Sequence, residues 1–124
     1  MLGLLAGAIP LRAHHSFAAE FDAKSRVTLT GVVTKIEWTN PHTYFYVAVK
    51  DDGGRVVNWA FETAGPNTLA RFGWDRKSLK IGDQVTVTGY RARDASNIAS
   101  AREVKLADGR KVFAGATGDG GPQR

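Results

Sequence analysis

Two adjacent histidines, His14 and His15, follow a short apolar leader, MLGLLAGAIPLRA, that ends at Ala13. The leader is too short to span a bilayer as a helix, which needs about 20 residues. It is typical of the core of a secretory signal with a small residue at the cleavage point. Cleavage after Ala13 would give His14 a free α-amine beside two imidazoles, a set of nitrogens that can bind a metal. The competing interpretation is two polar residues on a mobile terminus.

The third histidine, His42, follows the Thr39–Pro41 turn. If the N-terminal segment crosses the mouth of the fold, we expect His14, His15 and His42 to converge. Imidazole and amine nitrogens suit Cu(II), Ni(II) and Zn(II), and the order of affinities favours copper. Copper is therefore the candidate cofactor.

Two copper geometries remain open, and they differ in where the leader is cut. A chain that begins at His14 offers the amine and ring of its first residue, and His42 would complete a histidine brace. A chain that begins at Ala13 has a histidine in third place, His15. Its amine, two backbone nitrogens and that imidazole would form a square-planar clamp.

A second hypothesis concerns a binding face for an anionic or ring-bearing polymer, such as a nucleic acid or an oligosaccharide. Aromatic side chains can stack on bases or sugar rings, and the basic half of the chain would attract the polymer. Turn chemistry for Asn40 and ordinary strand propensity for the tyrosines are the plainer interpretations. The candidates for this face are Glu37, Trp38, Asn40, Tyr44 and Tyr46.

Motifs that indicate an enzyme are missing from the sequence. It contains no nucleophile elbow, phosphate loop or metalloprotease helix motif. Glu37 and Glu62 could serve as a general acid or base beside His42, but the sequence does not fix their separation. We therefore expect a binding protein rather than an enzyme, with copper redox chemistry as the one open exception.

The charge and the cysteine content limit which partners and which stabilising interactions we expect. The 124 residues carry a net charge of +5 and no cysteine. All of the excess positive charge lies after residue 63, where there are eleven Lys and Arg but only six Asp and Glu. Such residues either attract an anionic partner or simply solvate exposed strand faces. Without cysteine, an exported domain of this size depends on packing rather than disulfides.

Alternation of apolar and polar residues predicts several short strands and one short helix. Pro66 near the start and Gly73 at the stop delimit the helix. The expected strands are Val27–Trp38, His42–Lys50, Arg55–Glu62, Gln84–Tyr90, Ile98–Leu106 and a short sixth strand that ends at Phe113.

This order predicts an all-β fold with one short helix, a small OB-fold-like barrel of five to six strands. A sandwich of the same strands is the alternative, but a lone helix between the third and fourth strands argues against it. A change of phase at Gly31 predicts a bulge or kink in the first strand. The expected core comprises Phe45, Val47, Val49, Val57, Trp59, Phe61, Val85 and Val87.

The expected organisation is a leader over residues 1–13, one β domain over 14–114 and a disordered Gly-rich tail over 115–124. No positive segment precedes Leu2, so we expect the gene product to start upstream. The leader predicts a periplasmic or secreted protein whose mature chain has no membrane span. Export would remove nucleic acid from the expected partners and leave another periplasmic protein as a candidate.

Four motifs in order resemble a family of small exported bacterial proteins classed as a domain of unknown function. They are AHHSF at Ala13–Phe17, EWTNPH at Glu37–His42, NWAFE at Asn58–Glu62 and LADGRKVF ending at Phe113. The resemblance implies export and a compact β domain. It implies no established activity.

Overall fold

The computed structural model describes residues 17–113, so His14, His15, the leader over 1–13 and the tail over 115–124 lie outside the described residues. Two short helices and six strands make up this part of the chain. They are α1 (Phe17–Glu20), β1 (Phe21–Glu37), β2 (Tyr44–Lys50), β3 (Val56–Glu62), α2 (Pro66–Arg71), β4 (Gln84–Ala92), β5 (Ile98–Leu106) and β6 (Lys111–Phe113). None of the helices described here is long and apolar enough to cross a membrane.

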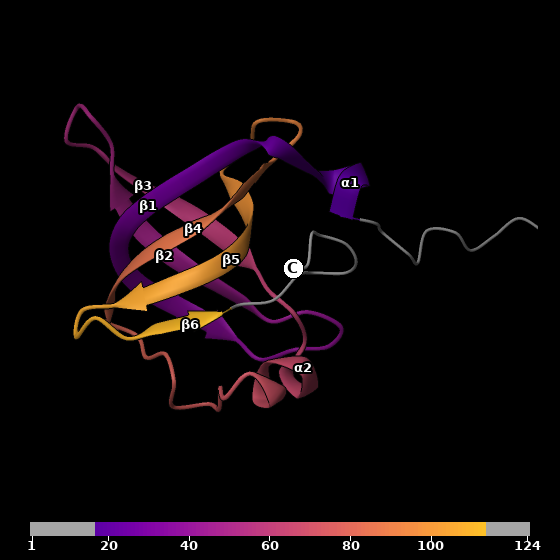
Figure 1. Cartoon of the computed structure of the whole chain (residues 1–124). Helices are drawn as coiled ribbons and strands as arrows, with labels where there is room; N and C mark the ends of the chain where they lie inside the picture. Colours follow the sequence, from indigo (N-terminus) through magenta and orange to yellow (C-terminus); the bar gives the residue numbers. More distant parts are fainter. Residues whose placement is uncertain (1–16, 114–124) are drawn as a thin grey trace, which may run out of the picture.

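The strands close into a small barrel (Figure 1). β1 pairs antiparallel with both β2 and β4, β2 pairs with β3, and β4 pairs with β5. A parallel pairing between β3 and β5 closes the ring, and β6 extends it beyond β5. With α2 between β3 and β4, this is the arrangement of an OB-type barrel. The predicted fold class is confirmed, and the sandwich is not formed.

The N-terminal part of the fold differs from the expectation in two ways. A second short helix, α1, precedes the barrel, and β1 begins at Phe21 instead of Val27. The physical reason is that Phe21 pairs with Ala92, so the lead-in segment continues along β4. The register shifts between Phe21 and Arg26. Because of this irregularity, the segment lacks the regular alternation from which a strand is predicted.

The phase of β1 also differs from the expectation at Gly31. Val33 is buried at 1% exposure whereas Val32 is 41% exposed, so the inward face runs through Gly31 unchanged. The register shift lies between Val33 and Lys35. The prediction of a bulge at Gly31 is therefore wrong in position, because the irregularity lies further along β1. Gly31 has a different role.

Gly31 allows two strands to approach β1 closely. It pairs with Val49 of β2 and with Val85 of β4, at the point where β1 passes from one partner to the other. A Cβ atom at Gly31 would stand 2.1 Å from the carbonyl oxygen of Ala48. Any side chain would therefore force the strands apart.

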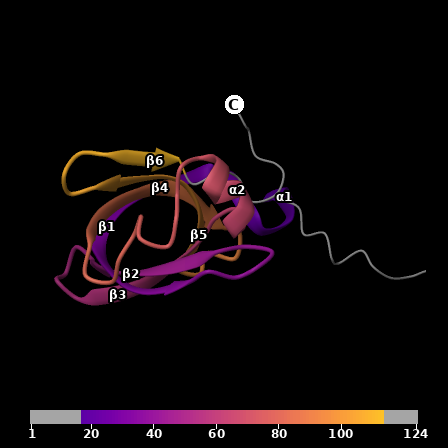
Figure 2. The ribbon, with the colours of Figure 1, turned by 90° about the horizontal axis from the view of Figure 1, so that it is seen from below.

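The core matches the expected alternation at seven of the eight positions, and Val57 is half-buried instead. Phe61 stacks on Phe45 at 5.2 Å and on Trp59 at 6.3 Å between ring centroids. Leu69 of α2 and Trp74 after it belong to the same cluster, so the helix and the segment behind it cover one end of the barrel (Figure 2).

Trp59 gives a direct test of this core. Trp59 is 8% exposed, and Trp59→Ala should lower the free energy of unfolding by about 3–5 kcal/mol in chemical denaturation. Ile81 is 69% exposed, and Ile81→Ala should change it by less than about 0.5 kcal/mol. Equal effects of the two substitutions would contradict the assignment of Trp59 to the core.

Candidate functional site

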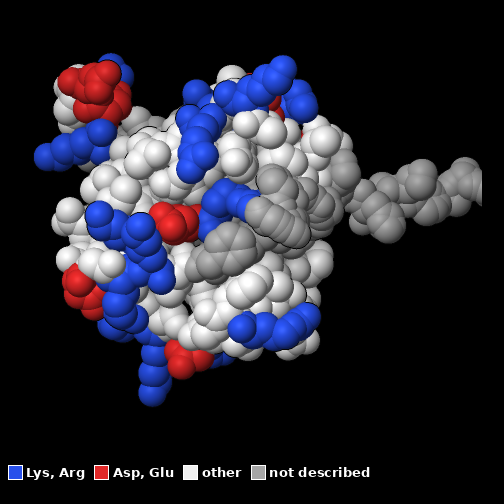
Figure 3. Space-filling model, viewed as in Figure 1, with Lys and Arg blue, Asp and Glu red and all other residues white. Residues whose placement is uncertain are grey.

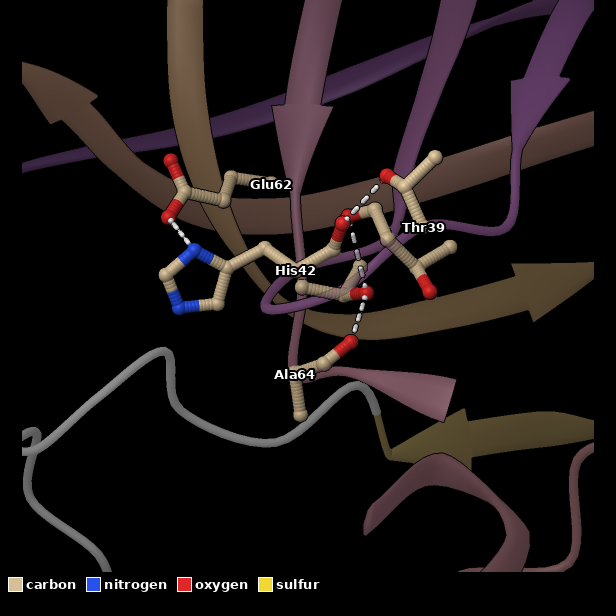
Figure 4. Close-up of polar contacts among 6 residues, drawn as sticks. Thr39, His42, Glu62 and Ala64 are labelled. Atoms are coloured by element: carbon tan, nitrogen blue, oxygen red, sulfur yellow. Dashed lines mark hydrogen bonds and ion pairs between the residues drawn. The ribbon is translucent and has the colours of Figure 1, made fainter. Parts of the chain in front are cut away.

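His42 lies in the connection between β1 and β2, directly after the cis Asn40–Pro41 peptide bond. The side chain of Thr39 donates a hydrogen bond of 2.7 Å to the carbonyl oxygen of His42. On the other side, the amide of Thr43 donates to the carbonyl oxygen of Ala64, which follows β3. Figure 4 shows the contact of Thr39 with the carbonyl oxygen of His42. The backbone of the histidine is therefore held in place by its neighbours.

The side chain of His42 contacts a buried carboxylate. Its Nδ1 atom lies 2.8 Å from Oε2 of Glu62 at the end of β3, and the exposed fractions of the two side chains are 25% and 7% (Figure 4). A neutral imidazole that donates its Nδ1–H to a carboxylate carries its lone pair on Nε2. This is the arrangement in which a carboxylate orients a metal-binding histidine.

Tyr44 contacts the same carboxylate from the opposite strand. Tyr44 and Glu62 face each other in the β2–β3 pairing. Burial, the charges of Glu62 and Glu20, and a hydrogen bond to Glu62 together raise the pKa of Tyr44 to about 12. The neutral phenol is thus a second donor to Glu62, which helps to hold the carboxylate against His42.

The position of Glu62 beside His42 is not predicted from the sequence. The sequence suggests only a general acid or base there, with no fixed distance to His42. The strand alternation contains the missing information, because Phe45 and Phe61 both point inward and must face across the hairpin in a compatible register. That register places Tyr44 opposite Glu62.

Two candidates for the polymer-binding face are bound to each other. The hydroxyl of Tyr46 donates to Glu37 at 2.9 Å, and Lys35 lies 3.1 Å from the second carboxylate oxygen. The Tyr46 hydrogen bond and then the Lys35 contact lower the pKa of Glu37. Burial, followed by the bond to Glu37, raises the pKa of Tyr46. The ammonium of Lys35 lies 5.4 Å from the centroid of the Tyr46 ring.

The remaining two candidates lie at the same end of the barrel as His42. Trp38 is half-buried, with its ring edge-to-face against Trp74 at 6.4 Å and the Arg76 guanidinium 5.9 Å from its centroid. Asn40 is exposed in the turn before Pro41. The structure thus places Trp38 in packing and Asn40 in a turn.

The described residues supply one histidine to any metal site. Within residues 17–113, no three His, Cys, Asp or Glu side chains form a group that could hold a metal ion. His14 and His15 lie outside that range, so the structure does not test whether they meet His42.

Tyr44 provides a test of the carboxylate environment. In an alkaline absorbance titration of the three tyrosines, one should ionise near pH 12, and Tyr44→Phe should remove that step. A tyrosine in the unfolded chain ionises near pH 10. The raised pKa therefore stabilises the folded protein fully below about pH 10, and this contribution should be lost as the pH rises toward 12. A step near pH 12 that survives in Tyr44→Phe would contradict the assignment.

Comparison with known proteins gives a family but no activity. No curated protein and no solved structure matches the chain. A model described as a family of unknown function (DUF6152) matches residues 3–101, a range that includes all three histidines and Glu62. Since the match covers most of the sequence, the chain belongs to this family of unknown function.

Proposed function

We propose that this protein is an exported small binding protein that holds one copper ion through His14, His15 and His42. The observation that carries the proposal is the 2.8 Å contact between His42 Nδ1 and the buried carboxylate of Glu62. A histidine held in this way presents Nε2 in the form that binds a metal. The apolar leader before His14 supports export to the periplasm or the medium.

A charge at the start of the described chain acts on Tyr44, which lies beside the His42–Glu62 pair. His14 is three residues before Phe17, and an extended chain spans at most about 3.3–3.6 Å per residue. The reach from Phe17 is therefore about 10 Å. Glu20 at the end of α1 lies near enough to Tyr44 for its charge to raise the pKa of that phenol. Tyr44 in turn contacts Glu62, the partner of His42.

The fixed imidazole favours the brace over the clamp. In the brace, the α-amine and ring of His14 bind the metal together with His42. In the clamp, which would begin at Ala13, His42 is not a ligand. Because a buried carboxylate orients His42, we assign it a ligand role and place the mature terminus at His14.

Binding of an anionic or ring-bearing polymer is the second hypothesis. It would require free aromatic faces on the outer surface of β2. Tyr46 is already bonded to Glu37, and Lys35 lies over its ring. Trp38 packs against Trp74 beneath Arg76. These contacts favour the metal hypothesis.

Copper titration of defined N-termini tests the proposal. The chain that begins at His14 should bind one Cu(II) tightly, and one extra residue before His14 should weaken binding strongly because the amine and ring no longer belong to one residue. His42→Ala should also weaken it. Bound copper should be insensitive to salt and released below about pH 5–6, where the ligands become protonated.

Three other outcomes have distinct meanings. Tighter binding by the chain that begins at Ala13, with no effect of His42→Ala, would replace the brace by the clamp. Equal and weak binding by every form would refute a metal site. Retention of a polyanion that falls steeply with salt would support the polymer hypothesis instead.

Glu62 provides an independent test of the same site. Glu62→Gln removes the charge that orients and polarises His42, and it should lower copper affinity by about 10- to 100-fold. Glu103→Gln on β5 is the matched control and should leave the affinity unchanged, because Glu103 faces Thr88 and Phe113 in the strand pairing rather than a histidine. An unchanged affinity in Glu62→Gln would show that the carboxylate does not serve the metal.

A further inference from the structure

Strand β1 is paired along its whole middle section on one edge but only in part on the other. It pairs with β4 from Arg26 to Val32, whereas β2 begins to pair with the opposite edge only at Gly31. Among residues 17–113, no strand pairs with that opposite edge before Gly31. The first part of β1 therefore presents an uncovered strand edge.

The backbone groups on this edge follow from the alternation along β1. The amide of Val33 donates to the carbonyl oxygen of Asp83, on the β4 side of the strand. Backbone groups in a strand point alternately to its two edges, so those of Thr28 and Thr30 point away from β4. The hydroxyls of Thr30 and Thr86 lie 2.9 Å apart, as expected for the close side chains of a pair that exchanges no backbone hydrogen bonds. The amides and carbonyls of Thr28 and Thr30 thus lie on the uncovered edge.

The uncovered edge borders a groove at the end of the barrel away from α2. The groove has a volume of about 500 Å³ and lies between residues 28–30 of β1 and residues 49–52, where β2 turns toward β3. Leu29, Val57 and Trp59 contribute apolar side chains to its lining, and the first two are only half-buried. Figures 1 and 3 show the tip of the β2–β3 hairpin standing away from the barrel beside this opening.

Three cations lie at the groove. Arg26 precedes Thr28 on the exposed surface of β1, and Lys50 is exposed at the end of β2. The Arg91 guanidinium lies 5.0 Å from the centroid of the Trp59 ring and donates a hydrogen bond of 2.8 Å to the side chain of Asn97. None of the three forms an ion pair within the part of the chain that the structure describes. Each therefore has donors left for a partner.

The acids near the groove are mostly engaged in local hydrogen bonds. Asp51 accepts from two backbone amides of its own turn, and Asp94 accepts from the amide and hydroxyl of Ser96. Asp52 is the remaining acid of the lining. Charge complementarity thus favours an acidic partner. A second copy of this chain would bring like charges together, which opposes pairing between copies.

We propose that this edge and groove bind an extended acidic segment of a partner protein, which adds to β1 as a further strand. Its backbone would pair with Thr28 and Thr30, and its inward side chains would be apolar and cover Leu29. Its outward side chains would be acidic and lie beside Arg26 and Lys50. In this mode of recognition, backbone hydrogen bonds supply affinity and side-chain pockets supply selectivity. The proposal uses no metal ligand and does not depend on copper binding.

Hydrogen exchange measured by NMR on the full chain tests the position of the added strand. The probe is the peptide Glu-Val-Glu-Val-Glu with blocked ends. In the free protein the amides of Thr28 and Thr30 should exchange fast, whereas the amide of Leu29, which points to β4, should be protected. Saturating peptide should slow exchange at Thr28 and Thr30 by about tenfold or more, because both amides become hydrogen-bonded. Unchanged exchange at both would overturn the proposal.

Substitutions on the edge test its backbone and its charges separately. Thr28→Pro removes one amide of the uncovered edge and should weaken peptide binding by about tenfold, whereas Thr28→Val keeps that amide and is the matched control. Arg26→Gln and Lys50→Gln should each weaken binding by about two- to fivefold. Lys105→Gln, at an exposed position on β5, should leave it unchanged. Equal binding by all of these variants would contradict the proposed site.

Altered peptides test the same contacts without any change to the protein. N-methylation of either the glutamates or the valines blocks one edge of the extended peptide at a time. Only one of the two methylated peptides should lose binding, since an added strand uses one edge. Equal binding of Lys-Val-Lys-Val-Lys would overturn the acidic partner. Protection of Thr28 and Thr30 that rises with protein concentration in the absence of peptide would assign the edge to a second copy instead.

Discussion

The backbone contact at Gly31 is the constraint on which the barrel depends. At this residue β1 is paired with β2 on one side and with β4 on the other. A Cβ atom would collide with the carbonyl oxygen of Ala48, so only glycine leaves room for the approach. Since one long strand serves both neighbours, the sheet can curl until β3 and β5 meet. The parallel pairing of Glu62 with Ser100 follows from that closure.

The closure also explains why an acidic residue on an outward-facing position of β3 is buried. Glu62 is 5% exposed although it faces away from the core residue Phe61. A desolvated carboxylate is costly unless it is hydrogen-bonded. His42 and Tyr44 supply the donors, and their positions are fixed by the β1–β2 connection and by β2. The hydrogen bond that the buried Glu62 carboxylate requires therefore also fixes the imidazole of His42.

The sequence predicted those features that depend on regular alternation. β5 begins and ends where expected, and five of the six residues predicted to point inward from the β2–β3 hairpin are buried, with Val57 half-buried. Features set by irregular backbone were missed. The register shifts near Phe21 and after Val33 break the alternation on which a strand prediction relies. Helix α1 was missed because four residues carry too little periodicity to distinguish a helix from a loop.

The candidate site, like the fold, was predicted only in part from the sequence. His42 is a candidate from the sequence alone, because an imidazole is a side chain that can bind a metal. Its partner Glu62 is twenty residues away in the sequence, and only the register of a hairpin relates the two. The contact between the rings of Phe17 and Tyr90 likewise depends on where β4 ends. Long-range contacts of this kind follow from closure of the barrel, which local pattern does not encode.

The proposed metal site would combine ligands from the barrel and from the chain terminus. The barrel would contribute one imidazole, which Glu62 holds in place, and the terminus would contribute ligands whose number depends on where the leader is cut. In the proposed brace, the α-amine of His14 becomes a ligand only after cleavage. A precursor that keeps its leader would then lack one ligand. Metal affinity would thereby be linked to export, with no disulfide or thiolate required from a chain that has no cysteine.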